Sequence, residues 1–122
     1  MIDEHAREAL RQLKAAGPNG LTRAELAERL GVHERDAREA LAWLRRNAVA
    51  AVISQRVHTG RQPVYVYRLA QTREEYLRYR HGLVSRIIEL ARSVRGLDRA
   101  WQFLDPELDP LLERVIRLGG VK

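Results

Sequence analysis

The chain of 122 residues contains no cysteine. This absence excludes disulfide scaffolds, zinc sites built on thiolates and thiol catalysis. Long hydrophobic runs are missing as well, because charged or polar residues interrupt every apolar stretch after a few residues. A transmembrane helix is therefore not expected. The segment that begins at Met1 is acidic and lacks the apolar core of a signal peptide, so we expect a cytoplasmic protein.

Catalytic and metal-binding patterns are also missing. The segment Gly17–Gly20 lacks the lysine and hydroxyl residue of a phosphate-binding loop, and no G-x-S-x-G sequence occurs. The four histidines are scattered along the chain, without the H-E-x-x-H spacing of a zinc site. We therefore expect that the protein is not an enzyme and that it needs no cofactor or metal.

Basic residues are in excess, and their distribution is uneven. The chain has 22 Lys and Arg residues against 16 Asp and Glu, a net charge of +6, and only Lys14 and Lys122 are lysine. Between Glu39 and Glu74 there is no acidic residue at all. That interval contains six arginines, namely Arg45, Arg46, Arg56, Arg61, Arg68 and Arg73. A stretch of this kind is typical of a surface that neutralises phosphates.

Three helices are predicted in the first part of the chain. The first spans residues 3–16 and ends at the glycine and proline cluster that follows. Thr22 and Glu25 have the spacing of a capping box, which predicts a second helix that ends near Gly31. The third helix is predicted over 34–46 because small and apolar residues recur on one of its faces, at positions Ala37, Ala40, Leu41, Leu44 and Ala48.

The pattern then changes to that of strands. Residues 49–53 and 64–67 are rich in β-branched and aromatic side chains, and the segment between them is polar and basic. This order predicts a β-hairpin with Thr59 and Gly60 at its tip.

The pattern of the remaining residues predicts helices again. Thr72 and Glu75 form a second capping-box pattern, from which a long helix runs to about Arg95 and stops at Gly96. Short helices are expected over 97–104 and, after the N-capping acids Asp105 and Asp109, over 111–118. The long helix carries a coiled-coil-like row of apolar residues, interrupted by Arg80, that consists of Leu83, Ile87, Leu90 and Val94. We expect a homodimer through this row.

The segments LTRAELAERLGV (21–32) and AREALAWL (37–44), together with the hairpin, resemble the winged helix-turn-helix superfamily of bacterial and phage regulators over about residues 3–70. The resemblance implies a mainly α fold with a small β-hairpin. The winged helix-turn-helix domain would cover 1–70, and a C-terminal helical segment for dimerisation or partner binding would cover 71–122. The resemblance also implies that helix 34–46 enters the major groove of DNA. The hairpin tip at Thr59, Gly60 and Arg61 would then touch the DNA backbone or minor groove.

We therefore expect a sequence-specific binder of double-stranded DNA, a transcriptional regulator. Contacts to bases or grooves are expected from the outer face of the third helix, namely Arg35, Arg38, Glu39 and Arg46. Contacts to phosphates are expected from the start of the second helix and from the basic interval, namely Thr22, Arg23, Arg45, Arg56 and Arg61.

An alternative use of the same fold stays open. Glu34, Asp36 and Glu39 place three acids on the third helix, and they weaken its attraction to DNA. His33 also stands where many members of the superfamily have a Ser or Thr cap. The alternative is a winged helix that mediates protein–protein contacts in a phage, replication or transcription assembly.

Overall fold

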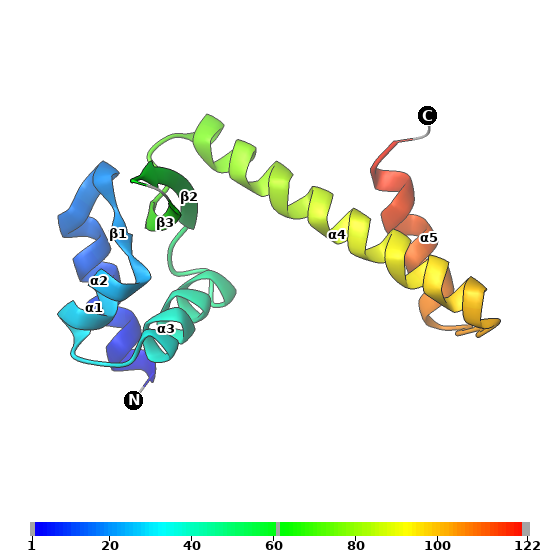
Figure 1. Cartoon of the computed structure of the whole chain (residues 1–122), viewed down its shortest axis with the longest axis horizontal. Helices are drawn as coiled ribbons and strands as arrows, with labels where there is room; N and C mark the ends of the chain where they lie inside the picture. The colour runs from blue at the N-terminus through cyan, green and yellow to red at the C-terminus, as the bar shows by residue number, and fades with distance from the viewer. Residues whose placement is uncertain (1, 61, 121–122) are drawn as a thin grey trace. The chain divides into compact units, whose positions relative to one another are not determined.

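A computed structural model describes residues 2–60 and 62–120. Their elements are α1 (Ile2–Ala16), the 3₁₀ turn η1 (Gly17–Asn19), β1 (Leu21–Thr22), α2 (Arg23–Leu30), α3 (Glu34–Arg46), β2 (Val52–Thr59), β3 (Gln62–Leu69), α4 (Arg73–Trp101) and α5 (Leu108–Leu118) (Figure 1). The expected class is confirmed in its coarse form, since the described chain is mainly helical with one small antiparallel sheet. It divides into two compact units, Met1–Tyr76 and Leu77–Lys122.

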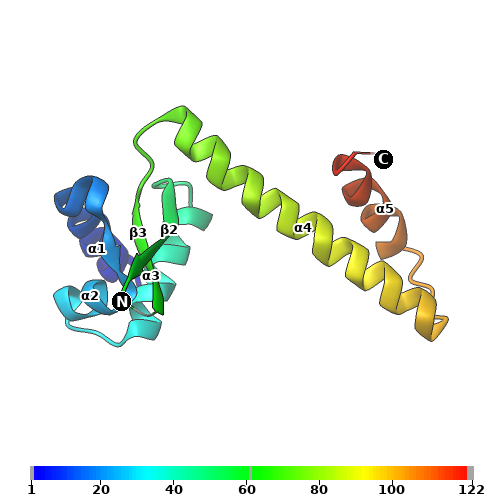
Figure 2. The ribbon, with the colours of Figure 1, turned by 45° about the horizontal axis from the view of Figure 1, so that its top comes forward.

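The first unit is built on one apolar cluster beneath its helices. In Figure 2, α1, α2 and α3 gather beside the hairpin. Their inward faces carry many alanines, which let the helix backbones approach closely. The predicted inner face of α3 is confirmed for four of its residues. The buried cluster consists of Ala6, Ala9, Leu13, Leu21, Leu26, Ala27, Ala37, Ala40, Leu41, Leu44 and Val52. Ala48 is exposed and follows the end of α3, so its assignment to the inner face was wrong.

The predicted hairpin is present, but its strands are longer and shifted relative to the prediction. The sheet order is β1-β3-β2, with antiparallel pairing throughout. Polar residues that were expected in the loop pair across the ribbon, with Arg56 opposite Tyr65 and Thr59 opposite Gln62. Gly60 lies at the tip with a φ of 67°, a value that glycine adopts without strain. β1 was not predicted, because a strand of two residues carries no periodic signal.

Helix α2 is fixed at both of its ends. The Glu25 backbone N–H donates to Thr22 Oγ1 at 3.0 Å, and the Thr22 N–H donates to Glu25 Oε1 at 2.9 Å, so the predicted capping box is confirmed. Gly31 ends α2 in the left-handed conformation with a φ of 68°. The Thr22 N–H, and after it the Thr22 hydroxyl, lowers the pKa of Glu25 below its ordinary value because both stabilise the carboxylate.

The beginning of α4 is held by the first unit. Thr72 caps the helix as predicted, since its Oγ1 accepts from the Glu75 N–H at 3.1 Å. The Glu75 carboxylate reaches past Thr72 to the N–H of Gln71 at 2.9 Å, and it also forms an ion pair with Arg68 of β3. These contacts explain why the first unit extends to Tyr76, beyond the boundary at residue 70 that was predicted.

The predicted end of α4 at Arg95 and Gly96 was wrong, and so was the short helix over 97–104. α4 continues through Gly96 to Trp101, because no strong helix breaker lies between them and one internal glycine costs only about 1 kcal/mol. Gln102 then turns left-handed with a φ of 59°, and the Phe103 N–H donates to the Asp98 carbonyl at 2.8 Å.

α5 begins earlier than predicted, at Leu108 rather than Leu111. Asp105 Oδ1 accepts from the Leu108 N–H at 2.9 Å, so its predicted capping role is confirmed, whereas Asp109 lies inside the first turn of the helix. α5 contacts α4 through an ion pair between Glu113 and Arg95. A Cβ built on Gly119 would lie 3.1 Å from Ile88 Cγ2, which shows how closely the two helices approach there.

Replacing each of two glycines by alanine should change the free energy of unfolding in opposite directions. Gly20→Ala should lower the free energy of unfolding by about 2–3 kcal/mol, because φ is 68° and the new Cβ would lie 2.7 Å from the Tyr67 carbonyl oxygen. Gly82→Ala should raise it by about 0.5–1 kcal/mol, because Gly82 lies inside α4 with open space around it. Urea titrations of both variants measure these changes, and a shift of the same sign in both would contradict the assignment.

Replacing Glu25 by glutamine should make stability less dependent on pH in the acid range. The folded state lowers the pKa of Glu25, so its charge stabilises the fold above the ordinary glutamate pKa. That contribution is lost as the pH falls through the folded-state value. Glu25→Gln retains an oxygen that can accept from Thr22, so we expect a small loss of stability at neutral pH that disappears in acid. Thermal unfolding at both pH values tests this, and an equal loss at both would refute it.

Candidate nucleic-acid interface

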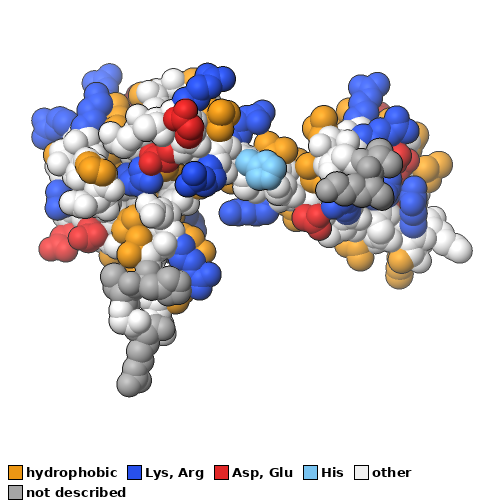
Figure 3. Space-filling view, turned by 90° about the horizontal axis from the view of Figure 1, so that it is seen from above, with side chains coloured by type: hydrophobic (Ala, Val, Ile, Leu, Met, Phe, Trp, Pro, Cys, Tyr) orange, Lys and Arg blue, Asp and Glu red, His pale blue; other side chains and the backbone are white. Residues whose placement is uncertain are grey.

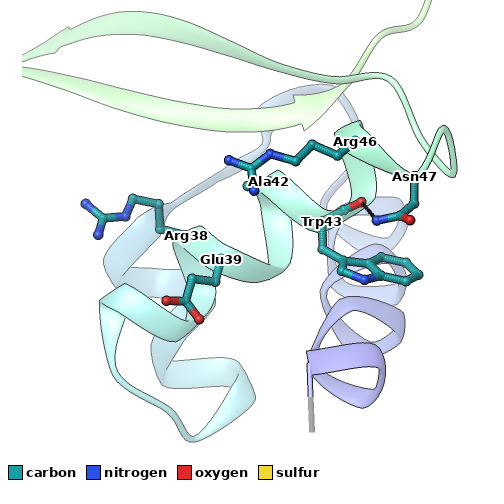
Figure 4. Close-up of a pocket in the computed structure, with 6 residues that line it drawn as sticks. All are labelled: Arg38, Glu39, Ala42, Trp43, Arg46 and Asn47. Atoms are coloured by element: carbon teal, nitrogen blue, oxygen red, sulfur yellow. Dashed lines mark hydrogen bonds between the residues drawn. The ribbon is translucent and has the colours of Figure 1, made fainter.

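Two rows of side chains lie along the outer side of α3. Each row has a spacing of four residues, the period that places side chains above one another on a helix. Together they line an open hollow of about 630 Å³ (Figure 4). The first row is Arg38, Ala42 and Arg46, and the second is Glu39, Trp43 and Asn47.

Several arginines of α3 are available for an external contact. Arg35, Arg38 and Arg46 are exposed, and within the described residues none of them forms an ion pair or a side-chain hydrogen bond. Figure 4 shows Arg46 extending back along the helix past Ala42, with Arg38 one turn further toward the N-terminus. The helix therefore presents a basic row in which the small Ala42 lets a ligand approach the backbone.

Three residues of the hollow were not among the expected contacts, namely Ala42, Trp43 and Asn47. Trp43 is partly buried against the core of the first unit, and its carbonyl accepts from Asn47 Nδ2 at 2.9 Å. Asn47 is thereby held at the C-terminal end of α3. The four-residue spacing from Arg38 and Glu39 is the sequence signal that could have identified all three.

The N-termini of α2 and α3 are joined by an ion pair. Arg23 Nε lies 3.3 Å from Glu34 Oε1, and both side chains are partly exposed. This pair compensates one of the three acids on α3. It also occupies the guanidinium that was expected to bind a phosphate. Thr22 is occupied too, because its hydroxyl and its N–H both bind Glu25, whose carboxylate already sits at this helix end.

The arginines of the acid-free interval separate into two groups. Arg45 Nε donates to the carbonyl of Val52 at 2.8 Å, and Arg68 binds Gln55 and Glu75 with only 11% of its side chain exposed. These two hold the hairpin against its neighbours, so Arg45 has a structural contact in place of the free guanidinium that was expected. Arg46, Arg56 and Arg73 stay exposed.

The expected contacts at the tip of the hairpin are only partly described. Arg61 lies outside the described residues, and of Thr59 only the backbone pairing is described. Gly60 is exposed. Arg56 is exposed on β2 opposite Tyr65, which is 54% exposed. The hairpin therefore presents at least one arginine and one aromatic ring to its surroundings.

Other kinds of site find no support in the described part of the chain. Over residues 2–60 and 62–120, no three His, Asp or Glu side chains gather as a metal site would require. No helix in the same ranges is both long and apolar enough to cross a membrane. The visible surface in Figure 3 is dominated by Lys and Arg among the charged side chains, with fewer Asp and Glu.

Comparison with known proteins gives no assignment for this chain. No family model, no curated protein and no solved structure matches it. What the basic row on α3 does must therefore follow from its own side chains and from the elements that carry them.

Proposed function

We propose that the first unit is a winged helix-turn-helix that binds double-stranded DNA, with α3 in the major groove and the β2–β3 hairpin as the wing. The order α1-β1-α2-α3-β2-β3 supports this reading, as does the turn at Gly31 that joins α2 to α3. The pairing of β1 with β3 ties the hairpin to the start of α2. The protein would act as a transcriptional regulator.

The row Arg38–Ala42–Arg46 is the observation that carries the proposal. Its two guanidinium groups leave the helix eight residues apart, about 12 Å along the axis, so both can reach the edges of the bases in one major groove. Arginine is the usual bidentate ligand of guanine, and the methyl group of Ala42 fits against thymine. Glu39 lies in the adjacent row, where a carboxylate can accept from cytosine.

Phosphate contacts are assigned to the side chains around this row. Arg56 on the hairpin is exposed and has no partner within the described residues. Arg23 can bind a phosphate by exchanging its exposed ion pair with Glu34, since surface pairs of this kind contribute little stability. Arg45 was expected to bind a phosphate, but its hydrogen bond to Val52 gives it the role of positioning the hairpin beside α3.

Contacts within the first unit account for two of the three acids of α3, and this favours DNA over a protein as its partner. Glu34 pairs with Arg23, and Asp36 lies in the first turn, where the helix dipole stabilises a negative charge. Glu39 alone is left among the three as an exposed acid without an ion pair in the described residues. We therefore favour DNA over a protein as the ligand of α3, and the binding experiment distinguishes the two.

The adjacent residues Arg45 and Arg46 offer a matched pair of substitutions. Arg46→Ala should weaken binding to a site selected from a random duplex library by about 1–3 kcal/mol, or roughly 5–150-fold, and leave the melting temperature unchanged. Arg45→Ala should instead lower the melting temperature, because it removes the bond to Val52. Fluorescence anisotropy and thermal unfolding measure the two effects.

An arginine on another helix provides the charge control. Arg11→Ala on α1 changes the net charge equally, at a side chain that pairs with Glu8 and is 77% exposed. It should alter DNA affinity by less than about twofold at moderate salt, because Arg11 lies on α1, outside the row on α3, and salt screens exposed charges that do not contact the DNA. Equal losses in Arg11→Ala and Arg46→Ala would refute the assignment of α3. Failure of the natural chain to bind duplex DNA even at about 50 mM salt would replace DNA by a protein partner.

A further inference from the structure

The second unit buries too little apolar surface for its size. Among its described residues only Ile88, Ala91 and Leu112 are buried. A helical hairpin of this length has a marginal core by itself, and segments of this size usually need a metal, disulfides or association to be stable. The chain has no cysteine, and the described residues offer no metal site. Association is the remaining route.

A row of large apolar side chains on α4 remains uncovered, and we call it the α4 seam. It consists of Leu83, Ile87, Leu90, Val94, Leu97 and Trp101. Five of these side chains are exposed, from 37% at Leu83 to 64% at Leu90 and 84% at Trp101. The continuation of α4 through Gly96 adds Leu97 and Trp101 to the row that the sequence suggested. Orange side chains reach the surface beside the arginines of this unit in Figure 3.

The α4 seam lies on a different face from the one that contacts α5. α5 contacts the face that carries Ile88 and Arg95, through Gly119 and Glu113 respectively. Ile87 and Leu90 lie roughly 100° and 160° around the helix from Ile88, at about 100° per residue. α5 therefore does not cover the seam.

The spacing and residue types of the α4 seam are those of a two-stranded coiled coil. Successive members are separated by four, three, four, three and four residues, which is an unbroken heptad repeat. This repeat places Ile87 and Val94 at a positions and the three leucines at d positions. β-branched residues at a with leucine at d favour two parallel strands. The residues of the seam therefore indicate another copy of the same helix as its occupant.

The uncovered area also agrees with a dimer. With on the order of 100 Å² for each large apolar side chain, the exposed fractions leave on the order of 300 Å² uncovered on the α4 seam. Contiguous apolar patches of about this size on a protein surface are often functional, and pairing two α4 seams would cover the patch on both copies.

We propose that two copies of the chain form a homodimer in which the α4 seams pair in parallel and in register. Arg80 occupies the a position one heptad before Ile87, and a single polar residue at such a position sets the register of a coiled coil. This inference goes beyond DNA binding and does not depend on it. A parallel pair would nevertheless present two DNA-binding units from one end of the paired helices.

A charge placed in the α4 seam should separate the dimer. Leu90→Glu should convert the full chain from dimer to monomer in sedimentation equilibrium, because Leu90 is mostly exposed in the single chain and would be buried in the pair. Part of the helical circular dichroism should be lost with the dimer, because the second unit depends on association for its stability. Ser85→Glu, on an exposed face of the same helix, should remain dimeric. A monomeric natural chain at high micromolar concentration, or an unchanged dimer in Leu90→Glu, would overturn the proposal, and neither result would bear on DNA binding by the first unit.

Single cysteines test the orientation of the two helices, because the natural chain has none. In a parallel pair each d residue faces its own copy, so Leu83→Cys and Leu97→Cys should each form a disulfide-linked dimer under mild oxidation. Ser85→Cys should not. Failure of both single-cysteine chains to cross-link, in a chain that Leu90→Glu still converts from dimer to monomer, would overturn the parallel arrangement.

Discussion

Burial of one face of α3 determines which of its side chains the first unit presents to its surroundings. Ala37, Ala40, Leu41 and Leu44 pack into the cluster formed with α1 and α2. Because a helix has a fixed period, burying these residues turns Arg35, Arg38 and Arg46 outward. Small alanines make close packing possible, so the outer face can be chemically varied without changing the core. Any loss of this packing would remove the basic row as a defined surface.

The positive charge of the chain has two different uses. Arg45 and Arg68 are hydrogen-bonded within the fold, where they hold the hairpin beside α3 and beside the start of α4. Arg38, Arg46 and Arg56 remain exposed for an external ligand. A count of basic residues does not separate these uses, because the two kinds alternate along the chain. Only the partners of each guanidinium distinguish a structural arginine from one that can bind phosphate or bases.

The sequence predicts what is local or periodic in this molecule. It predicts the position of α3, both residues of the Thr22 capping box and the presence of the hairpin, because side-chain spacing encodes each of them. It fails where distant residues decide, as at β1, which exists only through β3. It also fails at Gly96, where a local helix-stop signal is outweighed by the good helix-forming residues on either side. For the candidate site it identifies the exposed face of α3, but it cannot show that Arg23 and Arg45 already have partners.

The strand pairing of the hairpin limits how the length of the hairpin can change. β1 pairs only with Val66 and Tyr67, so over the described residues the outer part of the β2–β3 ribbon has no third strand beside it. Residues could be inserted there or removed without disturbing the helices, but only as opposed pairs from both strands. A single extra residue on one strand would force a bulge or shift the pairing, and a shift by one position turns every side chain beyond it to the opposite face. Variants with longer or shorter hairpins should therefore differ in steps of two residues.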